Sequence, residues 1–139
     1  MTDTQGQNSE KLRAFYQGYN ATKGANRGDF LALCADSVTM GSLGGATPGA
    51  EFLSDSKSKA EVAAYLDDLF STWDMNSYVL RDVIAQGDGV VAVADISFTF
   101  KQTGKHVKCR KADIFKFQDG VIVEFYEYFD TAAFRDAMT

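Results

Sequence analysis

The segment from Lys105 to Asp130 constrains the fold most, because two apolar, aromatic-rich runs flank a turn signal at residues 118–120. Such a pattern predicts a β-hairpin. The length of its loop decides which side chains share a face. A two-residue turn at Asp119-Gly120 would pair odd positions with even ones, whereas a three-residue loop with Gly120 left-handed pairs odd with odd. We favour the three-residue loop because it separates apolar from charged side chains more cleanly.

This register predicts an inner face that is apolar, with charges at the end away from the turn. Its members are Lys111, Asp113, Phe115, Phe117, Val121, Val123, Phe125, Glu127 and Phe129. Lys111 is expected to lie opposite Glu127. The outer face is amphipathic and suits solvent or a partner subunit; it holds Arg110, Ala112, Ile114, Lys116, Ile122, Glu124, Tyr126 and Tyr128.

Composition limits the domain count and the partners. A chain of 139 residues with 45% apolar content suits one buried core, so we expect a single domain over residues 9–139 after a disordered terminus at 1–8. A net charge of -5 without a basic cluster argues against nucleic acid and anionic membranes as partners. Cys34 and Cys109 lie in apolar segments and are expected to be free thiols, which fits the cytoplasm. No membrane span or secretory leader is expected.

Helical periodicity appears in three places before the hairpin. Ser9 is expected to cap a helix that ends near Lys23-Gly24, with an apolar stripe of Leu12, Phe15, Tyr16 and Tyr19. A short helix follows with Asp29 as its N-cap and Phe30, Leu33 and Cys34 pointing inward. The capping box Ser58-Lys59-Ala60-Glu61 opens a long helix, whose stripe is Val62, Leu66, Leu69, Phe70 and Trp73.

Strands are expected at 38–40, 77–85 and 90–101, the last with Ala92, Ala94, Ile96, Phe98 and Phe100 on one face. The glycine-rich segment from Gly41 to Ser56, which contains the only proline, predicts a loop that serves as a lid. Asp130 is expected to cap a terminal helical turn at 131–138, with Phe134 closing the core. Helices first and an antiparallel meander afterwards predict an α+β fold, with the helices in the concavity of one curved sheet.

This order of elements, with the runs GDGVVAVADISFTFKQTGK (87–105) and ADIFKFQDGVIVEFYEYFD (112–130), resembles the SnoaL-like group of the nuclear transport factor 2-like superfamily. The resemblance covers nearly the whole chain from about Leu12. It implies a cone in which a bent antiparallel sheet wraps three helices, with a pocket at the open end and an outer sheet face used for dimerisation. The same cone hosts isomerases, cyclases, epoxide hydrolases, dehydratases and binding proteins, so the resemblance implies fold more than function.

Ketosteroid isomerase, a member of this superfamily, pairs a neutral carboxylic acid with a tyrosine that stabilises an enolate, while a second aspartate moves the proton. The resemblance places Asp113 at the position of the neutral acid. It places Phe15 at the position of the tyrosine and Gly41 at that of the base.

Limonene epoxide hydrolase, another member, uses an Arg-x-Asp pair and an aspartate in the last strand. Glu127 corresponds to that last-strand position, whereas the pair aligns with Ala94 and Ile96. The resemblance therefore implies one acid of each mechanism and neither complete set.

Asp113 and Glu127 are two carboxylates on one apolar face, the minimum for acid–base chemistry, and burial would raise their pKa values. We expect Asp113 to act as acid or oxyanion donor and Glu127 as base. Lys111 either anchors an anionic oxygen or forms an internal salt bridge with Glu127. Substrate contacts are expected from Phe15, Tyr16, Tyr19, Trp73, Phe125 and Phe129, with core packing as the alternative role of the aromatic residues.

No other chemistry is indicated by the sequence. Asp95 and the lone His106 are expected to face outward, so neither a triad nor a metal site is predicted. No phosphate-binding glycine motif is present, and we expect no cofactor. Two functions remain open: a cofactor-independent isomerase, cyclase or dehydratase acting on a small apolar carbonyl or cyclic substrate, and a non-catalytic protein that binds a hydrophobic ligand. The amphipathic outer face, rich in tyrosine, predicts a homodimer.

Overall fold

The computed structural model describes residues 4–42 and 56–139. The described elements follow the order α1 (Thr4–Ala21), α2 (Arg27–Leu33), β1 (Cys34–Ser42), α3 (Lys59–Thr72), β2 (Trp73–Gln86), β3 (Gly89–Phe100), β4 (His106–Gln118), β5 (Val121–Tyr128) and α4 (Thr131–Ala137). The predicted α+β fold is confirmed. Most of the expected lid, residues 43–55, lies outside the described residues.

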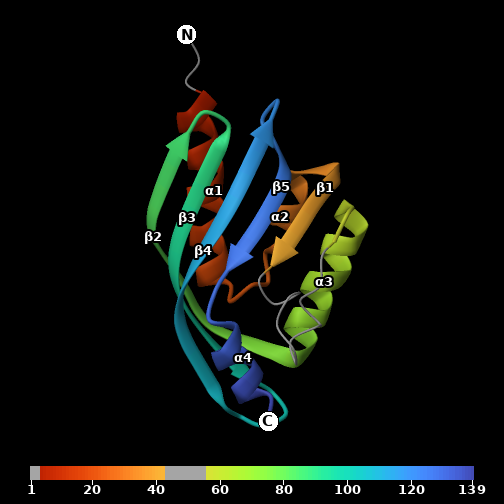
Figure 1. Ribbon diagram of the computed structural model, residues 1–139, viewed down its shortest axis with the longest axis vertical. Coiled ribbons are helices and arrows are strands. Elements are labelled where there is room, and N and C mark those ends of the chain that lie inside the picture. The colour runs from red at the N-terminus through yellow and green to blue at the C-terminus, as the bar shows by residue number, and fades with distance from the viewer. Residues whose placement is uncertain (1–3, 43–55) are drawn as a thin grey trace.

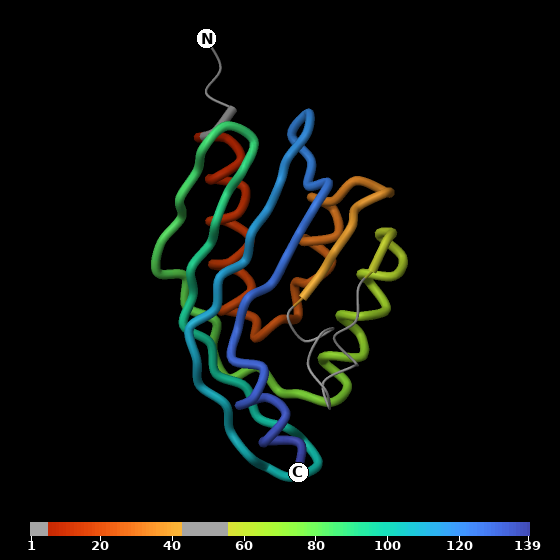
Figure 2. The backbone as a smooth tube through the Cα atoms, in the orientation of Figure 1, coloured from red at the N-terminus to blue at the C-terminus, as the bar shows by residue number. Residues whose placement is uncertain are grey.

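One sheet of five strands, in the order β1-β5-β4-β3-β2, organises the chain. In Figure 1 the helices α1 and α2 lie behind this sheet, and α3 runs beside its β1 edge. The tube in Figure 2 shows how β2, β3 and β4 bend toward the end where α4 lies, which gives the sheet its concave inner face. The antiparallel sheet expected from the sequence is in fact mixed, because β1 pairs parallel to β5.

The central hairpin, β4–β5, turns in two residues instead of three. Asp119 and Gly120 both have positive φ, 53° and 81°, as a type I′ turn requires. Gln118 pairs with Val121, and an irregularity between Lys116 and Phe117 then restores the pairing of odd with odd positions. The predicted division into inner and outer faces is therefore correct on the side of the irregularity away from the turn. It is wrong for β5 between the irregularity and the turn.

Two positions change as a result. Ile122, expected on the outer face, is fully buried, whereas Val121 and Val123 are only half-buried. Asp113, and not Lys111, is the register partner of Glu127. Both acids still point inward, because the side-chain period of a strand is two.

The starts and N-caps of the helices agree with the sequence prediction in part. The stripe Leu12, Phe15, Tyr16 and Tyr19 of α1 is buried as expected. However, α1 begins at Thr4, so the prediction of a disordered terminus was wrong for residues 4–8. The N-cap of α2 is Asn26 instead of Asp29. Ser58 caps α3 by accepting a hydrogen bond from the Glu61 amide at 3.1 Å, and Asp130 caps α4 by accepting one from Ala133 at 3.0 Å.

Two strands are longer than the sequence predicted. β1 extends from residue 34 to 42 instead of 38 to 40. β2 starts at Trp73, whose extended backbone ends α3 and whose register partner is Phe100. Both cysteines are free, Cys34 buried and Cys109 half-buried, as expected. Among the described residues, no helix is long and apolar enough to cross a membrane.

Candidate functional site

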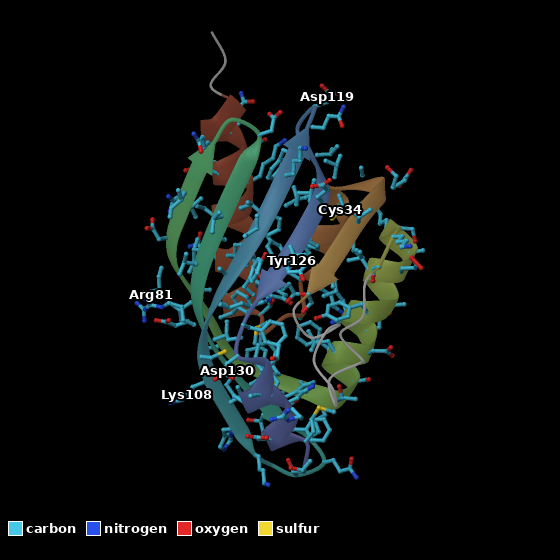
Figure 3. All side chains as sticks on the ribbon, viewed as in Figure 1. Cys34, Arg81, Lys108, Asp119, Tyr126 and Asp130 are labelled. Atoms are coloured by element: carbon cyan, nitrogen blue, oxygen red, sulfur yellow. The ribbon has the colours of Figure 1, made fainter. Side chains whose placement is uncertain are left out.

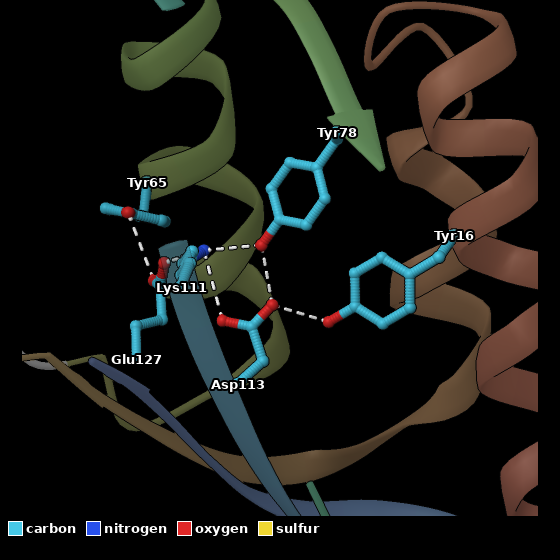
Figure 4. A network of polar contacts seen from close by, with 6 residues as sticks. All are labelled: Tyr16, Tyr65, Tyr78, Lys111, Asp113 and Glu127. Atoms are coloured by element: carbon cyan, nitrogen blue, oxygen red, sulfur yellow. Dashed lines mark hydrogen bonds and ion pairs between the residues drawn. The ribbon is translucent and has the colours of Figure 1, made fainter. Parts of the chain in front are cut away.

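A cluster of charged and phenolic side chains lies on the inner face of the sheet. Alternation along β4 turns Lys111 and Asp113 inward, and β5 adds Glu127 beside them. Three tyrosines complete the cluster from other elements: Tyr16 of α1, Tyr65 of α3 and Tyr78 of β2 (Figure 4). The site thus joins segments from one end of the chain to the other, and it forms only when the fold is complete.

Asp113 is held by two hydroxyl groups. Its Oδ2 accepts hydrogen bonds from Tyr16 at 2.5 Å and from Tyr78 at 2.6 Å. Its Oδ1 lies 3.1 Å from the Nζ of Lys111, an ion-pair contact without hydrogen-bond geometry. Since Asp113 is only 2% exposed, these groups replace the water that would otherwise solvate its charge.

Lys111 connects the two carboxylates. Its Nζ lies 2.5 Å from Glu127 Oε2 and also donates to the Tyr78 hydroxyl at 2.8 Å. Tyr65 donates to the other Glu127 oxygen at 3.2 Å. One ammonium therefore serves two buried acids, and the cluster carries an uncompensated negative charge whenever both acids are ionised.

Burial and charge shift the proton affinities of this cluster. Burial raises the pKa of Glu127, although the Lys111 ammonium opposes the shift. Burial works against the charged form of Lys111, but Asp113 and Glu127 hold its pKa well above the ordinary value. Burial also raises the pKa of Tyr16, Tyr65 and Tyr78 well above the ordinary value, so these phenols remain hydrogen-bond donors.

The cluster faces a cavity of about 40 Å³. Its remaining walls are largely apolar, and four of the expected substrate contacts, Phe15, Tyr16, Tyr19 and Phe125, are among the lining residues. Ligand pockets of drug size measure roughly 300–1,000 Å³. A ligand of more than a few atoms must therefore move side chains as it enters.

Two of the expected contacts lie elsewhere. Trp73 is buried at the junction of α3 and β2, where its ring packs 4.8 Å from Phe100 and 4.9 Å from Phe134, and it does not line this cavity. Its helical spacing placed it on the α3 stripe, but the helix ends one residue earlier. Phe129 lines a second, neighbouring cavity.

Sequence reasoning missed Tyr65 and Tyr78. Tyr65 lies one turn after Val62 and could have been included in the α3 stripe. Tyr78 was hidden by the register shift between Met75 and Ser77, which interrupts the alternation along β2. The family resemblance placed Phe15 at the tyrosine position, whereas the helix hydroxyl that reaches Asp113 belongs to the next residue, Tyr16.

The residues expected to face outward do so. Asp95 binds Arg81 at 2.7 Å and Arg110 at 2.8 Å on the outer surface, and Figure 3 shows Arg81 at the margin of the molecule. Hydrogen bonds from Arg110 and Arg81 lower the pKa of Asp95 to about 2. His106 is exposed, and its Nδ1 lies 2.6 Å from the Thr99 hydroxyl. Within residues 4–42 and 56–139, no three metal-ligating side chains gather.

Solved structures share this fold. A nuclear transport factor 2-like protein from Burkholderia thailandensis is 22% identical, with 95% of this chain and 97% of that chain covered and a TM-score of 0.78. TerC, co-crystallised with polyporic acid, is 20% identical over 95% and 98% of the two chains, with a TM-score of 0.79. Bal32a, from a soil-derived mobile gene cassette, is 19% identical over 99% and 100%, with a TM-score of 0.75. At these identities the likeness concerns the fold alone.

No curated protein matches the sequence. The family model of the SnoaL-like domain matches residues 12–125, which cover α1 from Leu12 onward, α2, α3 and the sheet up to Phe125. Of the cluster, only Glu127 lies beyond the match. The chain therefore belongs to the SnoaL-like family, and its fold is that of the nuclear transport factor 2-like proteins.

Proposed function

We propose that this protein is a cofactor-independent acid–base enzyme, of the isomerase, cyclase or dehydratase type, that acts on a small, largely apolar carbonyl or cyclic substrate. The observation that carries the proposal is Lys111, which holds two buried carboxylates, Asp113 and Glu127, at the wall of an apolar cavity. Burying three ionisable groups costs several kcal/mol per ion before pairing. A cavity that only had to hold an apolar ligand would gain nothing from that cost.

The arrangement suggests a division of roles on a ketone. The Glu127 carboxylate takes a proton from the carbon beside the carbonyl, and the electron pair of that C–H bond moves onto the carbonyl oxygen as an enolate. The Lys111 ammonium stabilises the developing negative charge. The proton then passes from Glu127 to Asp113 through the Lys111 ammonium, which contacts both carboxylates. Asp113, held by Tyr16 and Tyr78, gives the proton back to a carbon of the enolate as the carbonyl re-forms, so both acids return to their starting charge.

Two further observations support a small-molecule role. TerC, a relative in fold, was crystallised with polyporic acid, a small organic molecule. Burial also raises the pKa of Glu127, and a raised pKa makes its carboxylate a stronger base.

A non-catalytic protein that binds a hydrophobic ligand is the second candidate. It is favoured by the small volume of the cavity, about 40 Å³, and by the intact pair of Lys111 and Glu127 at 2.5 Å. In such a protein the charges would fix the shape of the cavity and would take no part in chemistry.

Hydrogen exchange into a ketone separates the two functions. The protein is incubated in deuterated buffer with 2-octanone, 3-octanone or 4-octanone, and the deuterium gained by the ketone is measured by mass spectrometry. An enzyme of the proposed kind speeds this gain above the rate in buffer and in heat-denatured protein. Binding without faster exchange for all three ketones would refute proton transfer from carbon and favour the binding protein.

We also propose that the protein is a homodimer joined by the outer face of the sheet. Tyr126 and Tyr128 pack 4.8 Å apart there, and Tyr128 and Ile114 are 42% and 39% exposed. Figure 3 shows Tyr126 on the sheet face away from α1 and α2. Tyrosine and aliphatic side chains with a charged rim are typical of subunit interfaces.

Replacing Tyr126 by glutamate is expected to dissociate this dimer, because the new charge would lie in a desolvated, self-complementary contact. Sedimentation equilibrium measures the mass, which for the variant should fall to that of the 15.2 kDa chain. Gln102→Glu, an equally neutral-to-acidic change in the exposed β3–β4 turn, is the control and should stay dimeric. A wild-type protein that is monomeric at micromolar concentration contradicts the proposal.

A further inference from the structure

A second cavity, of about 20 Å³, lies next to the first. The two share part of their lining, including all of the second cavity's ionisable residues: Lys111, Glu127 and Tyr65. The residues that line only the second cavity are Ile96, Phe129 and Phe134, all apolar. The charged groups therefore form a partition with an apolar space on each side.

Tyr65 is the least tightly held member of the partition. The hydrogen bond from Tyr65 to Glu127, at 3.2 Å, is longer than any other contact that ties the cluster together. If the Tyr65 ring swings aside, Glu127 keeps its ion pair with Lys111 at 2.5 Å. The two cavities would then join without exposing an unpaired charge.

The far end of the second cavity is closed by α4. The Phe134 ring of this helix packs 5.0 Å from Phe129 and 5.9 Å from Phe98. A space of about 20 Å³ is little more than a single water needs, roughly 10–15 Å³. The size of residue 134 therefore limits what can extend past the partition.

We propose that the second cavity is a subsite of the same active site, which takes a short apolar group on the far side of the substrate's reacting carbon. The ligand class is a ketone with an apolar arm on each side of the carbonyl, one long and one short. The carbonyl then lies at Lys111 and Glu127, the long arm lies among the aromatic residues of the first cavity, and Phe134 sets the length of the short arm. The choice of a carbonyl rests on the proposed function; the two apolar arms rest on the cavities alone.

Octanone isomers test the subsite, because they have the same composition and differ in where the carbonyl divides the chain. From 2-octanone to 4-octanone the short arm grows from methyl to propyl, while the long arm shortens from hexyl to butyl. Nuclear Overhauser effects are measured from each ketone to two methyl reporters: Leu66, which lines only the first cavity, and Ile96, which lines only the second. For 3-octanone we expect contacts to both reporters in the wild-type protein. Contacts to Leu66 alone, or no binding by any of the isomers, would overturn the proposal.

Phe134→Leu tests the length limit. It should improve the affinity for 4-octanone relative to 2-octanone by about fourfold, the effect of burying one further methylene. The control is Phe30→Leu, which enlarges only the first cavity and should not raise that ratio, because the added room lies beside the long arm, which is longer in 2-octanone. If Phe134→Leu leaves the ratio of the two affinities unchanged, residue 134 does not limit the length of the short arm. If this variant fails to fold, the Overhauser contacts of 3-octanone in the wild-type protein still test the subsite. If the protein does not speed deuterium exchange but the ketone still contacts both reporters, the proposed enzyme is refuted and the subsite stands. If exchange is faster but the contact to Ile96 is absent, only the subsite is refuted.

Discussion

Replacing Lys111 by methionine is expected to lower the free energy of unfolding by about 3–5 kcal/mol, the usual cost of removing one partner from a buried ion pair. The side chain of Lys111 is only 11% exposed, and it contacts both Asp113 and Glu127. Methionine fills a similar volume but leaves two buried carboxylates without a cation. Urea unfolding followed by circular dichroism measures the loss.

Two further variants separate this effect from a loss of packing. Lys108→Met removes an exposed lysine from the same strand and should change stability by less than about 0.5 kcal/mol. Adding Glu127→Gln to Lys111→Met should recover part of the loss, because one uncompensated charge disappears. If Lys111→Met costs no more than Lys108→Met, the cluster does not depend on its cation.

The sequence predicted correctly that Lys111, Asp113 and Glu127 lie on one face of the sheet. Side chains alternate along each strand, so a shift of the register by two residues leaves every side chain on the same face. The register itself was not predictable. The turn closes in two residues, and the irregularity between Lys116 and Phe117 compensates for it. Nothing in the apolar pattern marks such a bulge, since Val121, Ile122 and Val123 are equally suited to either face.

The aromatic residues were harder to assign, because the same side chains form the core and line the cavity. The stripe of α1 was correct: Tyr16 contacts Asp113 from a position that also packs on Phe115, 6.4 Å away. The prediction that Trp73 contacts the substrate was wrong, because Trp73 follows the last residue of α3, where helical spacing no longer applies. A pattern of apolar residues predicts burial, and only the folded chain shows which buried rings face an empty space.

Glu127→Gln is expected to slow deuterium exchange into the preferred ketone by about 100- to 10,000-fold, the usual contribution of a general base. Glutamine has the shape of the acid and can still bond Lys111 and Tyr65, but it cannot take a proton. Glu124→Gln, on the same strand with its side chain exposed, is the matched control and should exchange at the wild-type rate. Equal rates in the Glu127 and Glu124 variants would exclude Glu127 as the base.

The pH dependence of the wild-type protein and of these two variants gives an independent test of the role of Glu127. Its pKa is raised in the folded state by burial, so the folded protein holds this proton more tightly than the unfolded chain does. The stability that Glu127 contributes is therefore fully present below the ordinary pKa of 4.5 and is lost as pH rises through the folded value. Over that window the wild-type exchange rate should rise, because the base becomes ionised, while the free energy of unfolding falls. Glu127→Gln should remove both trends, and Glu124→Gln should preserve them; a wild-type protein that gains stability over this window would mean that pairing with Lys111 outweighs burial.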